Sequence, residues 1–115
     1  MKPVSSEQGG PAVAAFLRYL AAERGASPHT TRSYRADLLD CLGFLERRGL
    51  GALPDADARV VRGYLADLHA RGLARTSIAR RLAPLRSFFR FLIRRGRARV
   101  NPARQVRTPS VAKVE

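Results

Sequence analysis

The spacing of glycines is the feature that most constrains how this chain can fold. Gly25, Gly49, Gly72 and Gly96 recur about every 24 residues, and each closes an amphipathic run. Glycine is favoured directly after a helix because it adopts the left-handed backbone conformation without steric cost. The interval fits one helix plus one loop. The spacing therefore predicts an all-α fold, a small bundle of four helices with flexible ends.

Apolar periodicity places helices between these glycines, at about residues 12–24, 28–48, 57–70 and 76–96. Ser27 is a natural N-cap for the second helix, and Pro28 suits the first helical position. On the last helix, Arg81 and Arg86 flank a predicted core stripe, which consists of Ile78, Leu82, Leu85, Phe89 and Leu92. No strand pattern competes with the helical one, and 115 residues suit a single domain.

Pro84 lies inside the last predicted helix, where proline removes a backbone hydrogen bond and costs ~3 kcal/mol. We therefore expect a kink near Arg80–Arg81 or a helix that is interrupted there. After Gly96 the apolar periodicity fades and two prolines follow. This organisation predicts a flexible N-terminus at residues 1–10, a helical domain at residues 11–100 and a linker at residues 101–115.

The distribution of charge points to a polyanionic partner. The net charge is +13, and it is concentrated in one part of the chain. Residues 1–70 hold nine basic and eight acidic residues, whereas residues 71–115 hold thirteen basic residues and one acid. Such an excess is typical of nucleic-acid binding, although a solvated basic face is the simpler alternative. The phenylalanines fit structural positions better than a stacking surface, which favours duplex over single-stranded DNA.

Residues with catalytic or metal-binding chemistry form no recognisable constellation. Cys41 is the only cysteine, so no intrachain disulfide is possible, and we expect it to be buried. Tyr19, Tyr34 and Tyr64 fall on or beside predicted core stripes. No metal or cofactor is expected. The chain has neither an apolar run of the ~20 residues that span a bilayer nor a signal peptide, so we expect no membrane partner and a cytoplasmic location.

Three segments, in order, resemble one protein family: "SPHTTRSYRADLLDCLGFL", "RVVRGYLADLHARGLARTSIARRLAPLRSFFRFLIRRG" and "NPARQVRTP". They resemble the N-terminal core-binding domain of Xer-type tyrosine recombinases, which has the integrase SAM-like fold. The resemblance covers roughly residues 11–109. It implies an enzyme that clamps duplex DNA between this domain and a C-terminal catalytic domain, and that needs no metal or nucleotide cofactor. It further implies a covalent 3′-phosphotyrosine, four protomers on two recombination sites, and resolution of chromosome dimers at cell division.

The resemblance directs the second and fourth helices towards the major groove of DNA. The candidate contacts lie at the start of each helix, further along the fourth helix at Arg86, and in the linker: Thr30, Arg32, Arg35, Thr76, Ser77, Arg80, Arg81, Arg86, Arg104 and Arg107. The family's catalytic residues belong to the C-terminal domain, so the resemblance assigns none here, and the chain alone should be inactive. Two alternatives stay open: the equivalent domain of a phage or transposon integrase, and a stand-alone DNA-binding or protein-interaction module.

Overall fold

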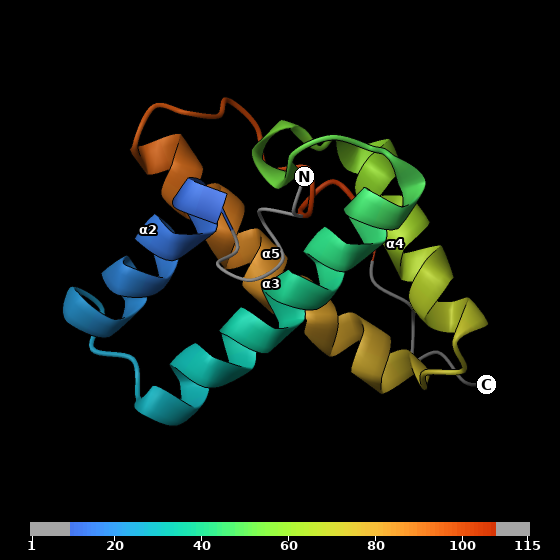
Figure 1. The fold of residues 1–115 in the computed structure, drawn as a ribbon, viewed down its shortest axis with the longest axis horizontal. Helices are drawn as coiled ribbons and strands as arrows, with labels where there is room; N and C mark the ends of the chain where they lie inside the picture. Colours follow the sequence, from blue (N-terminus) through green and yellow to red (C-terminus); the bar gives the residue numbers. More distant parts are fainter. Residues whose placement is uncertain (1–9, 108–115) are drawn as a thin grey trace. The chain divides into compact units, whose positions relative to one another are not determined.

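A computed structural model of the chain describes residues 10–107 (Figure 1). In that range it contains helices and no strand, in the order α2 (Gly10–Ala22), α3 (Pro28–Arg48), the 3-10 turn η1 (Leu53–Asp55), α4 (Ala58–Ala70) and α5 (Arg75–Arg94). The predicted all-α fold with four helices is therefore confirmed. The expected flexible N-terminus, apart from Gly10, and residues 108–115 of the expected linker lie outside the described range.

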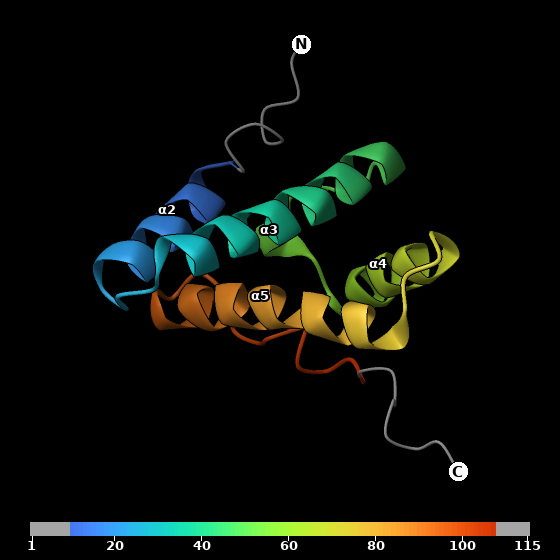
Figure 2. The same ribbon diagram turned by 90° about the horizontal axis from the view of Figure 1, so that it is seen from below.

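The chain divides into two compact units after Pro54. In the first unit α2 packs against α3, and in the second unit α4 packs against α5. Within the first, α2 and α3 lie side by side both in Figure 1 and in the rotated view of Figure 2.

Short polar side chains define the starts of α3 and α4. Ser27 has an extended backbone, and its Oγ accepts a hydrogen bond of 3.1 Å from the backbone N–H of Thr30. Asp57 does the same for α4, where Oδ1 accepts from the N–H of Val60 at 3.0 Å. These caps satisfy amides that have no partner within the helix. The capping role predicted for Ser27 is thus confirmed, and α5 differs because Ala74 at its N-cap makes no side-chain cap hydrogen bond.

The predicted glycine stops are confirmed, with positive φ angles between 61° and 90° at Gly25, Gly49, Gly72 and Gly96. Three of these helix ends share one hydrogen-bond pattern. The N–H of the residue after glycine donates to a carbonyl five residues earlier, in the pairs Leu50 to Leu45, Leu73 to Leu68 and Arg97 to Leu92. A side chain at such a glycine would be strained whatever space surrounds it.

The first helix runs over Gly10–Ala22, two residues earlier at each end than predicted. Its C-terminal shift has a local cause. The backbone N–H groups of Glu23 and Arg24 both donate to the carbonyl of Tyr19, at 2.8 and 3.1 Å. Sharing one acceptor ends the regular pattern of the helix at Ala22.

The interior face of α5 extends beyond the stripe that the sequence predicts. All five predicted stripe residues are buried, and so are three others, Pro84, Phe88 and Phe91. The rings of Phe88 and Phe89 meet edge to face at 5.3 Å between centroids. Phe91, which lies off the predicted stripe, is 4% exposed, and the guanidinium of Arg95 lies 4.6 Å from its ring centroid.

Of the kink or interruption predicted near Arg80–Arg81, the interruption is wrong, because α5 is continuous from Arg75 to Arg94 with Pro84 inside it (Figure 2). The kink stays a prediction. Leu82 and Leu85, on either side of the proline, are 0% and 2% exposed. Full burial of a leucine side chain contributes about 1.5–3 kcal/mol, so burial next to the proline offsets its ~3 kcal/mol cost.

Candidate nucleic-acid interface

The first turns of α3 carry the first group of predicted contacts. Thr30 is half-buried and takes part in the cap, since its Oγ1 accepts a hydrogen bond from Ser27 Oγ at 3.1 Å. Arg32 and Arg35 are exposed. Thr30 therefore takes part in the N-terminal cap of α3, while the guanidinium groups of Arg32 and Arg35 lie at the surface of the first unit.

An open surface hollow of about 430 Å³ lies beside these arginines. Its lining comes from the end of α2, the following loop and the start of α3, and consists of Ala21, Ala26, Pro28, Thr31, Arg32 and Arg35. The wall is mostly apolar, and its cationic groups belong to the two predicted arginines. The sequence pattern missed this hollow because its shape depends on how α2 and the loop pack beside α3.

The second group of predicted contacts lies on the first turns of α5. Thr76 and Arg80 are exposed, whereas Ser77 and Arg81 are half-buried. Neighbouring positions on this helix thus differ in how accessible their side chains are to a binding partner. Arg80 is exposed to solvent, while Arg81 is held against α4 by a hydrogen bond to Tyr64.

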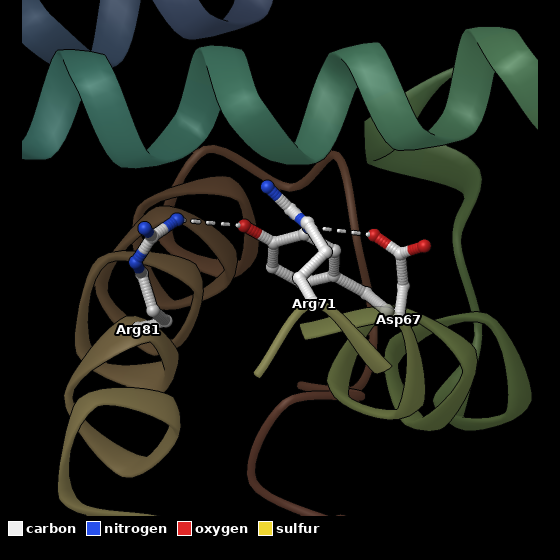
Figure 3. A network of polar contacts seen from close by, with 4 residues as sticks. Asp67, Arg71 and Arg81 are labelled. Atoms are coloured by element: carbon white, nitrogen blue, oxygen red, sulfur yellow. Dashed lines mark hydrogen bonds and ion pairs between the residues drawn. The ribbon is translucent and has the colours of Figure 1, made fainter. Parts of the chain in front are cut away.

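Arg81 is tied to a buried tyrosine of α4. Its Nη1 donates a 3.3 Å hydrogen bond to Oη of Tyr64, a residue that is 1% exposed (Figure 3). At the C-terminal end of the helix that carries Tyr64, the capping residue Arg71 donates from Nε to Asp67 Oδ2 at 3.1 Å. The sequence placed Tyr64 on a core stripe, which is confirmed, but gave no sign of its partner on α5.

Arg86, the next candidate on α5, points its side chain at its own chain. Nε donates to the carbonyl of Ala103 at 3.1 Å, and Nη2 donates to the carbonyl of Val106 at 3.5 Å. Arg104 and Arg107, from the segment that Arg86 contacts, are both exposed. The DNA-binding role of all ten candidate residues stays a prediction.

Positive charge is concentrated in the second unit. From Asp55 onwards the sequence has fifteen basic and four acidic residues, against seven and five in the first unit. Between residues 71 and 107 there are twelve arginines and no acid, and ten of those arginines are exposed. This surface creates a strongly positive potential that attracts polyanions.

The chemistry of other residues in the described range is limited. Residues 10–107 contain no group of three or more side chains arranged to hold a metal ion. In the same range, no helix is both long and apolar enough to cross a membrane. Cys41 is buried, as predicted, and this burial, with a smaller contribution from the nearby charge of Asp40, raises its pKa to about 12. The thiol is thus protonated and unreactive near neutral pH.

The fold and its basic surface agree with the comparison to known proteins. Residues 13–96 match the family described as phage integrase, N-terminal SAM-like domain, and the chain belongs to that family. It is 41% identical over 99 residues to the tyrosine recombinase XerD of Caulobacter vibrioides, covering 86% of this chain and 32% of that protein.

Two further relatives give the same picture. A XerD of Bradyrhizobium diazoefficiens is 50% identical over 78 residues, with 68% of this chain and 24% of that protein covered. A XerC of Oceanobacillus iheyensis is 39% identical over 98 residues, with 85% and 32% covered. The chain therefore spans about a third or less of the length of these curated relatives. No solved structure matches it. The resemblance to the core-binding domain of Xer-type recombinases is confirmed.

Proposed function

We propose that this chain is the duplex-DNA-binding half of a Xer-like site-specific tyrosine recombinase. The observation that carries the proposal is the exposed arginine surface of α5 and the segment after it, which contains no acid up to residue 107. Each phosphate that such a surface neutralises releases condensed counterions and strengthens binding at low salt. Membership of the integrase family supports the same reading.

Individual residues would divide the work of binding. Arg80 is exposed on α5 and has the reach and geometry to contact a guanine edge with two hydrogen bonds. Thr76 and Ser77 offer hydroxyls to phosphate oxygens, near the start of a helix whose dipole favours anions. On α3, Arg32 and Arg35 beside the surface hollow would hold a second stretch of backbone.

The strand-cutting chemistry belongs, in this proposal, to a C-terminal catalytic domain. Tyr64 lies in the interior and accepts a hydrogen bond from Arg81, so it is a structural residue rather than a nucleophile. The other partners are further protomers, assembled as a tetramer on two sites. The location is the cytoplasm, and the outcome is recombination that resolves chromosome dimers at cell division, without a metal or nucleotide cofactor.

The equivalent domain of a phage or transposon integrase is a second candidate, because the matched family is itself described by phage integrases. A stand-alone binding module is a third. The coding sequence downstream of Glu115 separates the third from the others. An open frame that continues into an Arg…Lys…His-x-x-Arg…Tyr pattern supports a recombinase, and a stop codon without that pattern supports a module.

Fluorescence anisotropy with a labelled duplex tests the DNA-binding proposal directly. We expect affinity to fall steeply between about 50 and 200 mM salt, by on the order of 10³-fold if about six arginines each neutralise a phosphate. Single-stranded DNA of the same length is the matched competitor and should bind more weakly. A flat salt response, or no binding at low salt, would refute the proposal.

A further inference from the structure

A single asparagine holds the segment after α5 against the second unit. Asn101, with 8% exposure, is the one buried side chain with an amide or charged group among residues 10–107. Its Nδ2 donates to the backbone carbonyl of Arg86 at 3.0 Å, and its Oδ1 accepts from the N–H of Ala103 at 3.2 Å. Burying a side-chain amide costs free energy unless its donor and acceptor groups are hydrogen-bonded. These two hydrogen bonds therefore offset the cost of burying Asn101.

Arg86 makes the reciprocal contacts from α5. Its carbonyl accepts from Asn101, while its guanidinium donates to the carbonyls of Ala103 and Val106. The two donors, Nε and Nη2, are fixed in one plane and reach two carbonyls at once. Lysine carries a single ammonium on a flexible stem and cannot reproduce this arrangement.

Apolar burial accompanies these hydrogen bonds. Pro102, Ala103 and Val106 are buried, whereas Arg104 and Arg107 are exposed. A turn bond of 3.0 Å, from the N–H of Arg104 to the carbonyl of Asn101, completes the local structure. We call the set of Arg86, Asn101, Ala103 and Val106 the clasp.

We propose that the clasp sets the point at which the chain leaves the second unit. The chain is then held to this unit at least as far as Val106, rather than only to Gly96, where the last helix is closed. Arg86 becomes a positioning residue, in place of the DNA contact that its position in the sequence predicted. Arg104 and Arg107 are thereby displayed from a fixed segment.

The clasp affects how far a segment that follows residue 107 could move from the second unit. In this proposal residues 97–106 are fixed to the second unit and add no length to a flexible connection with any segment that follows. A flexible chain spans a distance that grows with the square root of its length, at ~5–6 Å per root residue. A shorter flexible connection raises the effective concentration of the next segment near this unit. The clasp would therefore raise this effective concentration although it contacts no ligand itself.

Arg86→Lys tests the clasp at constant charge in the 115-residue chain. Amide hydrogen exchange at Ala103 and Arg104 is measured by NMR, and trypsin cleavage after Arg104 is followed in parallel. Loss of the paired donors should speed exchange at both amides, and cleavage, by about tenfold. The amides of α5 should keep their parental rates. Arg90→Lys is the matched control, since Arg90 is exposed on the same helix and donates only locally, to Ser87 Oγ.

Asn101→Ala attacks the clasp from the other side. Because the two residues act as one unit, the double variant should exchange little faster than either single variant. Additive effects would overturn the proposal, and so would unchanged exchange in Arg86→Lys. Uniformly faster exchange, or loss of helical circular dichroism in either variant, would overturn it as well, because the contacts would then support the whole unit.

DNA binding supplies an independent readout. Arg86→Lys should retain parental duplex affinity within about twofold, as expected when charge is kept and no base contact is lost. A large loss of affinity with unchanged exchange would make Arg86 a DNA contact and overturn the positioning role. If the chain fails to bind DNA at all, the proposed function fails, while the exchange experiment still decides the clasp.

Discussion

Removing the charge of Arg80 is the sharpest test of the proposed DNA interface. Arg80 is exposed near the start of α5, whereas its neighbour Arg81 is tied to Tyr64. Arg90 is exposed on the same helix, ten residues further on, and was not among the predicted contacts. Arg80→Ala and Arg90→Ala therefore remove the same charge from the same helix, one at a predicted DNA contact and one at an exposed arginine that was not predicted as a contact.

The expected size of the Arg80→Ala effect follows from counterion release. Each phosphate that the protein neutralises multiplies the association constant by a factor that varies as roughly the −0.9 power of the molar salt concentration. The dissociation constant of the variant should then exceed that of the parent by ~15-fold at about 50 mM, ~8-fold at about 100 mM and ~4-fold at about 200 mM salt. If Arg80 also contacts a base edge, about 1–3 kcal/mol is lost in addition at every salt concentration.

The assay is anisotropy of a labelled duplex titrated with parent, Arg80→Ala and Arg90→Ala over that salt range. Thermal unfolding by circular dichroism is the control for folding, and it should leave both variants near the parental midpoint. Equal losses for the two variants at every salt would refute the reasoning, because the arginines would then act only as a diffuse field. A clear drop in the midpoint of Arg80→Ala would show that its side chain supports the fold.

Three further predictions concern stability and reactivity. Leu82→Ala should cost ~2–5 kcal/mol in urea unfolding, because Leu82 is fully buried, and an unchanged midpoint would contradict its core role. Ser27→Ala should cost ~0.5–2 kcal/mol by the same method through loss of the α3 cap, and a smaller effect would mean that the Thr30 amide finds another acceptor. Cys41, with its pKa raised from 9.0 to about 12, should hold ~1000-fold less thiolate at pH 8. A thiol reagent should thus label it only after denaturation, and rapid labelling of the folded chain would show that the site opens.

The features that the sequence predicted well depend on interactions within one or two helical turns. Ser27 caps α3 through an amide three residues away, and Asp57, near which the third helix was expected to start, does the same for α4. Gly49 and Gly72 close their helices through carbonyls only a few residues earlier. Each of these is a local rule, so a single sequence is enough to apply it.

The features that it missed depend on residues distant in the chain. Continuity of α5 through Pro84 requires the burial of neighbouring leucines, which propensity alone does not include. Arg81 and Arg86 were both placed beside the core stripe, which their half-buried positions bear out. Their partners lie 17 residues away at Tyr64 and Ala103, and helix periodicity carries no information on that pairing.

The bare start of α5 has a consequence for anyone who sets out to make this domain more heat-resistant. Ala74 leaves the first amides of that helix without a side-chain acceptor, and serine or aspartate there is an obvious improvement, with a gain of ~0.5–2 kcal/mol. The same amides lie next to Thr76 and Arg80, where the proposed ligand brings its own oxygens. The side chain of an engineered cap would accept hydrogen bonds from the same N–H groups that a phosphate would otherwise bind. In this helix, therefore, thermal stability and affinity for DNA depend on the same few N–H groups, and a gain in one is expected to reduce the other.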